Sequence, residues 1–86
     1  MKDMGQPYPS QYKSRTAVVL FVKGAVTPIL LYFENPKAEY EDFLGYIKSS
    51  AHTPKLIEKE TIGPVKKIAI LSNQIAAVAI QEEQFN

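Results

Sequence analysis

The chain has 86 residues, with no cysteine, no tryptophan and a single histidine, yet 45% of it is hydrophobic. Its length suits one domain, and its formal net charge of +1 gives no overall attraction to nucleic acid or to a membrane. Without cysteine, disulfides and ordinary structural zinc sites are excluded within one chain. The composition therefore predicts a chain that folds around an apolar core and is poorly equipped for catalysis.

Residues 1–12 combine prolines, a glycine and tyrosines without periodicity, so we expect a mobile N-terminal arm. No apolar segment follows Lys2, as it would in a signal peptide. Together with the absence of cysteine, this favours a cytoplasmic location. The apolar run over residues 17–33 has Lys23 near its middle, where a lysine is costly in a bilayer, so we expect no membrane partner.

Two strands are predicted next, over residues 15–23 and 28–34. Both ranges are rich in β-branched, aliphatic or aromatic residues and are separated by turn-forming residues. Pro28 is tolerated because it stands at the first position of its strand. Alternate residues of a strand point to opposite faces, and both faces of these two strands are largely apolar.

Asn35 and Pro36 predict the start of a helix, since asparagine suits the N-cap and proline the first helical position. We expect this helix to run from about residue 36 to residue 49. Gly45 lies within it, and we attribute this glycine to close packing of the helix on the sheet. The apolar residues of the segment follow the spacing of a single buried stripe, formed by Tyr40, Phe43, Leu44 and Ile47.

Three further strands are predicted over residues 55–61, 65–71 and 75–81. The last of these is ambiguous, because alanine and glutamine favour helix and Ser72 would suit an N-cap. We predict a strand there, and we expect residues 83–86 to form a frayed tail.

The strand–turn–strand ending IAILSNQIAAVAI resembles the closing strands of many small β-barrels, including Sm-like ones. Those proteins place their helix before the sheet, whereas this chain places it in the middle. The resemblance concerns the fold alone and implies no function.

The order β-β-α-β-β-β predicts a single α+β domain over residues 13–82. We expect a strongly bent, mainly antiparallel five-stranded sheet or partial barrel, with one helix packed on it. The residues predicted to form its core are Val18, Leu20, Val22, Ile29, Leu31, Phe33, Phe43, Leu44, Ile47, Ile68 and Ile70.

Residues suited to catalysis are sparse. His52 follows the predicted helix near several hydroxyl side chains, but nothing in the spacing places a nucleophile, a base and an orienting acid together. The glycines are isolated and form no phosphate-binding loop. We therefore predict no catalytic residues, no metal site and no cofactor, and we expect that the chain is not an enzyme.

The sheet face away from the helix is the most informative surface. One helix cannot cover both sides of the sheet, and an apolar face of this size needs a cover, which curvature of the sheet, a ligand or a second copy could supply. We expect a second copy, as a homodimer, with Phe21 and Tyr32 side by side on adjacent strands. The predicted interface residues are Val19, Phe21, Tyr32 and Leu71, with a basic rim of Arg15, Lys23 and Lys67.

Two functions follow from this face. The first is a non-catalytic interaction or regulatory module that self-associates or meets another protein. The alternative is a module that binds single-stranded nucleic acid, with bases stacked on Phe21 and Tyr32 and phosphates held by the basic rim. The salt dependence of binding distinguishes the two functions, because phosphate binding weakens steeply with added salt, whereas apolar association does not.

Overall fold

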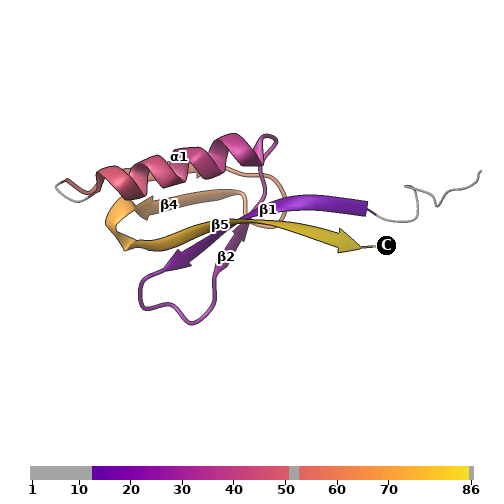
Figure 1. Cartoon of the computed structure of the whole chain (residues 1–86), viewed down its shortest axis with the longest axis horizontal. Coiled ribbons are helices and arrows are strands. Elements are labelled where there is room, and N and C mark those ends of the chain that lie inside the picture. The colour runs from indigo at the N-terminus through magenta and orange to yellow at the C-terminus, as the bar shows by residue number, and fades with distance from the viewer. Residues whose placement is uncertain (1–12, 51–52, 86) are drawn as a thin grey trace, which may run out of the picture.

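The structure, a computed structural model, describes residues 13–50 and 53–85 and has the predicted α+β architecture (Figure 1). Its elements follow the predicted order, and the fifth strand, where helix was the competing interpretation, is a strand. The elements are β1 (Lys13–Val22), β2 (Ile29–Leu31), α1 (Pro36–Ser49), β3 (Leu56–Glu60), β4 (Lys67–Leu71), the 3-10 helix η2 (Ser72–Gln74) and β5 (Ile75–Phe85).

The strands form two antiparallel sheets. β1 is the central strand of a three-stranded sheet in the order β2-β1-β5, and β3 pairs with β4 in a two-stranded sheet. An antiparallel bridge between Tyr32 and Ile62 joins the two sheets, with the Ile62 N–H donating to the Tyr32 carbonyl at 2.8 Å. The strands therefore bend into a partial barrel that stays open, as predicted.

Helix α1 begins and ends where the sequence predicts. The side chain of Asn35 accepts a hydrogen bond from the Ala38 N–H at 3.4 Å, which caps the first turn. The helix lies along one side of the strands (Figure 1), where it contacts β1 and β5. Gly45 is exposed, and a Cβ atom added there would meet nothing within 4 Å, so the expected close packing at this glycine is wrong.

The main core lies between α1 and the sheets. Phe43 is fully buried, and its ring centroid lies 6.3 Å from that of Phe33. Ile57 and Ile75 are also buried, although the sequence analysis did not include them. The predicted core residues that are buried are Val18, Leu20, Leu31, Phe33 and Phe43. Those that are partly buried are Val22, Ile29, Leu44, Ile47, Ile68 and Ile70.

Ile75 reaches this core because the pairing of β5 shifts by one residue. Phe21 lies opposite Ala77, but Val22 lies opposite Ile75, so Ala76 is an extra residue in β5. A bulge of this kind moves the side chains beyond it to the other face of the strand. Ile75 therefore turns toward the helix rather than away from it.

The C-terminal end of β5 differs from the sequence prediction. A frayed tail was expected over residues 83–86, whereas β5 continues to Phe85 and pairs with β1 as far as Lys13. Opposite charges face each other across this pairing, with Glu83 opposite Arg15, and such cross-strand pairs stabilise a sheet. The predicted arm over residues 1–12 lies outside the described residues, as do His52 and residue 86.

An ion-pair cluster joins α1 to β3. The Nζ atom of Lys59 lies 2.7 Å from Glu39 Oε1 and 2.5 Å from Asp42 Oδ2, and 5.7 Å from the ring centroid of Phe43. Burial alone would lower the pKa of Lys59, but the hydrogen bonds it donates to Asp42 and Glu39 outweigh burial, so its pKa is raised. Lys59 therefore stays charged while it holds the helix to the hairpin.

Candidate interaction face of the three-stranded sheet

The β2-β1-β5 sheet has one face under α1 and one face turned away from it. We call the second the open face. Because paired residues in an antiparallel sheet point to the same side, its members follow from the strand register. Among the residues whose side chains the structure describes, they are Arg15, Ala17, Val19 and Phe21 of β1, Leu30 and the adjoining Tyr32 of β2, and Ala77, Ala79, Gln81 and Glu83 of β5.

The centre of the open face is a small apolar cluster. Ala17, Val19 and Tyr32 are buried, and Leu30 and Ala79 pack around them. Val19 is 4% exposed and Tyr32 is 9% exposed. Two of the predicted interface residues are thus largely covered by neighbouring side chains of their own chain.

Phe21 is the large apolar side chain that is exposed among the described members of this face. It is 41% exposed and lies opposite Ala77, which is also exposed. The β1–β2 register, with Val18 opposite Leu31, places Tyr32 beside position 17. This is about 14 Å along the strand from Phe21, given a rise of about 3.4 Å per residue. The expectation that Phe21 and Tyr32 are neighbours is therefore wrong.

Leu71 and Lys67 do not belong to the open face. Both lie on β4, in the other sheet, where Leu71 faces Leu56 and Lys67 faces Glu60. Lys23 does adjoin the open face, because it directly follows β1 and its N–H donates to the Gln74 carbonyl at 2.9 Å. Of the predicted basic rim, Arg15 near the start of β1 and Lys23 just after its end therefore remain beside the open face.

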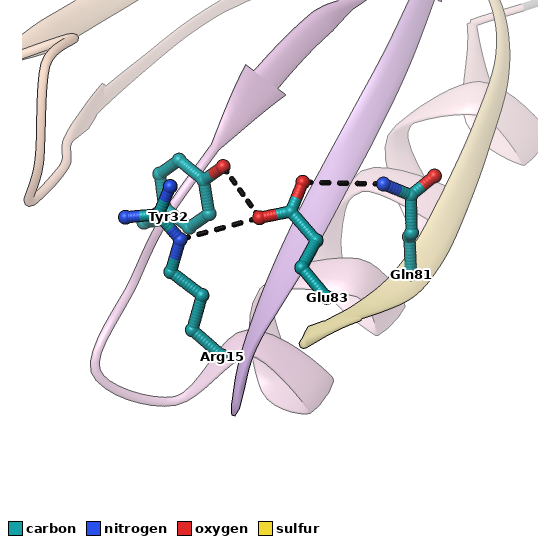
Figure 2. A network of polar contacts seen from close by, with 4 residues as sticks. All are labelled: Arg15, Tyr32, Gln81 and Glu83. Carbon is teal, nitrogen blue, oxygen red and sulfur yellow. Dashed lines mark hydrogen bonds and ion pairs between the residues drawn. The ribbon is translucent and has the colours of Figure 1, made fainter. Parts of the chain in front are cut away.

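A polar network occupies the other end of the open face (Figure 2). Tyr32 Oη donates a hydrogen bond to Glu83 Oε1 at 2.8 Å, and Arg15 Nε donates to the same oxygen at 3.2 Å. Gln81 Nε2 donates to Glu83 Oε2 at 3.2 Å. The guanidinium of Arg15 also covers the Tyr32 ring, with its Cζ atom 4.1 Å from the ring centroid, a cation–π geometry.

The network shifts the titration of two of its members. Burial raises the pKa of Tyr32, and so does its hydrogen bond to Glu83. The hydrogen bond from Tyr32, together with Arg15, lowers the pKa of Glu83 against the opposing effect of burial. Tyr32 is therefore held as a neutral hydrogen-bond donor, and Glu83 as a carboxylate paired with Arg15.

Glu83, Gln81 and the alanines of β5 are members of this face that were not predicted from the sequence. Their common signal is period-2 spacing from residue 77 to residue 83, which continues beyond the apolar part of the strand. The opposite charges of Glu83 and Arg15 were a second signal, because they are compatible with a cross-strand pair. The polar composition of the last residues instead led to the prediction of a tail.

A hollow of about 270 Å³ opens beside this network. Its lining includes Arg15, Tyr32, Pro36, Ile62 and Gly63. These residues offer an apolar surface and one arginine, but no acid and base side by side. Among the residues that the structure describes, no three histidine, aspartate or glutamate side chains gather as a metal site would require.

Comparison of the chain with protein-family models, with curated proteins and with solved structures gives no match. In the described ranges, 13–50 and 53–85, no helix is long and apolar enough to cross a membrane.

Proposed function

We propose that this chain is a small, non-catalytic interaction or regulatory module, located in the cytoplasm, that self-associates through its open face. The observation that carries the proposal is the exposure of Phe21 at the apolar end of a sheet face that α1 does not cover. The cytoplasmic location rests on the absence of cysteine.

The surroundings of Phe21 suit a second copy of the same chain. Ala77 faces Phe21 across the β1–β5 pairing, and Ala79 is the next residue of β5 on the same face. These short side chains leave a shallow surface on which a phenylalanine from a partner could lie. An isologous contact about a two-fold axis would place Phe21 of each copy over the alanines of the other.

The charges of the open face lie away from this apolar area. Arg15 and Glu83 pair with each other at one end of β1, and Lys23 follows the other end. Charges at the margin of an interface stay hydrated and cost little. The face therefore has the apolar centre and polar rim of a protein interface.

The nucleic-acid alternative has less support from the geometry. One face of the Tyr32 ring is covered by Arg15, and the tyrosine hydroxyl is bonded to Glu83. The arginine that would meet a phosphate already pairs with a carboxylate. Among the side chains that the structure describes, Phe21 then remains as the exposed aromatic ring of the face, whereas stacking platforms combine several aromatic rings with unpaired cations.

The substitution Phe21→Glu tests the proposal when followed by light scattering. A glutamate at the contact leaves a buried charge without a partner, so we expect a folded chain that has lost the face contact. Val26→Glu is the matched control, because Val26 is 98% exposed in the β1–β2 loop. If Phe21→Glu leaves the mass unchanged while Leu71→Glu lowers it, the contact lies on the outer side of the β3–β4 hairpin, and the proposal is wrong.

A further inference from the structure

The outer edge of β5, on the side away from β1, is a second surface suited to an interaction. β5 is an edge strand of the β2-β1-β5 sheet, and none of the described strands pairs with its outer side. It is 11 residues long, whereas the opposite edge strand, β2, has 3. Unpaired backbone groups along an edge of this length can pair with another strand.

The sequence of β5 carries few of the features that usually block such pairing. It contains no proline, lysine or arginine, which commonly protect edge strands. Its one irregularity is the extra residue Ala76 near the N-terminal end. From residue 77 to residue 85 the pairing with β1 is regular, so the outer edge there is regular as well.

We propose that two copies join edge to edge through antiparallel pairing of β5 with β5 of a second copy, about a two-fold axis at Ala79. The pairing would extend the sheet continuously from one copy into the other. It goes beyond the open-face contact, because it uses backbone groups at the strand edge rather than side chains on the face. Both contacts can exist together, in which case two perpendicular two-fold axes would close a tetramer.

The charge pattern of β5 selects the antiparallel direction. Residues 77–81 are uncharged, and Glu82 and Glu83 follow them. Parallel pairing would place each of these glutamates beside its own counterpart, and like charges in direct opposition destabilise a sheet. Antiparallel pairing sets the acidic end of each strand against the uncharged end of the other.

The same pattern places the axis at Ala79. Ala79 is the midpoint of residues 77–81, which lie between the bulge at Ala76 and the first glutamate, Glu82, so that regular, uncharged stretch would pair with itself. Glu83 would then lie beyond the regular pairing, close to the bulge at Ala76 and to Ile75 of the second copy. Ile75 adjoins Gln74, whose carbonyl accepts the hydrogen bond from the Lys23 N–H. The acidic end of one copy thus approaches the lysine-bearing end of the other.

Disulfide cross-linking tests this arrangement with little background, because the chain contains no cysteine. Ala77 and Gln81 are both exposed, and an axis at Ala79 places Ala77 of one copy opposite Gln81 of the other. Cross-strand neighbours have Cβ atoms about 4.5–5.5 Å apart, close to the separation that a disulfide needs. Two copies of the same position would lie about 14 Å apart along the strands, too far for a disulfide.

The experiment uses the full chain with Phe21→Glu in the background, which removes the open-face contact. Ala77→Cys and Gln81→Cys are oxidised separately and as a mixture, with Gln84→Cys as the control at a third exposed position. We expect at least about fivefold more cross-linked dimer in the mixture than in any single variant, given the separations above. Strong cross-linking of every variant with itself would indicate parallel pairing, and no cross-linking in any sample would show that the edges do not meet. Either result overturns the proposal.

Amide exchange gives a readout that does not depend on cysteine. In the Phe21→Glu chain, protection of the outward-facing amides of β5 should rise with protein concentration, while that of β2 should not. Equal protection at all concentrations would mean that the chain itself covers the edge, against the proposal. If Phe21→Glu fails to change the mass of the wild-type assembly but the mixed cysteines still cross-link, the open-face contact fails and the edge contact stands.

Discussion

The hydroxyl of Tyr32 reaches across the central strand β1 to donate a hydrogen bond to Glu83 at 2.8 Å. Tyr32 lies just after β2, and Glu83 lies near the end of β5, so the bond connects the two outer strands of the sheet. Arg15 on β1 bonds to the same carboxylate oxygen. These contacts hold the last residues of β5 against β1 and close one end of the open face.

Glu83→Gln should lower the stability of the chain at neutral pH and change it much less in acid. The folded-state pKa of Glu83 lies below its ordinary value. Its carboxylate therefore contributes stability above about pH 4.5, and this contribution is lost as the pH falls through the lowered pKa. Urea unfolding of both chains at pH 7 and at pH 3 measures the difference.

Glu82→Gln is the matched control for this prediction. Glu82 is the neighbouring residue, is exposed and points to the opposite face of β5. We expect its substitution to affect stability less than that of Glu83 at pH 7. Equal effects of the two substitutions would show that the hydrogen bonds of the network add nothing to stability beyond the loss of one negative charge.

The sequence predicted the elements well because each one carries a local signal. β-branched runs mark the strands, and Asn35 with Pro36 marks the start of α1. The sequence also predicted which side of the helix packs against the sheets, since Phe43 lies at the centre of the apolar stripe and is buried. The predicted alternation of side chains between the two faces of β4 is also confirmed, since Ile68 and Ile70 pack against the core.

Relationships between elements were harder to predict. The separation of Phe21 from Tyr32 depends on the register of a hairpin whose loop carries no distinctive turn motif. The placement of Leu71 depends on the division of the strands into two sheets. The bulge at Ala76 shifts the pairing of β5 by one residue, which turns Ile75 into the core. Nothing about Ala76 in the sequence marks it as the site of a bulge. Such features arise from pairing between distant segments, which local patterns do not record.

Phe43→Ala should remove most of the stability of the chain. Phe43 is fully buried against Phe33, and truncating a buried phenylalanine costs about 3–5 kcal/mol. A loss of this size approaches the whole stability of a small domain. Lys37→Ala, at an exposed helix position, should leave the thermal midpoint nearly unchanged. A similar midpoint for wild type and Phe43→Ala would contradict the packing of α1 described above.

Gly63→Ala and Gly45→Ala should have opposite effects on stability. Gly63 has a φ of +89°, and an added Cβ would lie 3.2 Å from Cδ2 of Tyr32, so we expect a loss of about 1–3 kcal/mol from backbone strain. Gly45 is helical and a Cβ there meets open space, so alanine should stabilise by about 0.5–1 kcal/mol. Thermal unfolding of the two variants checks both signs, and a stabilising Gly63→Ala would contradict the contact with Tyr32.

The central claim is that this chain self-associates through the β2-β1-β5 sheet, and the mass of the wild-type chain in solution tests it most directly. Sedimentation equilibrium over a wide range of concentration should show a mass that rises from that of the 9.6 kDa chain to at least twice this value. The association should persist or tighten in high salt, because it is apolar. A single mass of 9.6 kDa at every concentration would contradict the account.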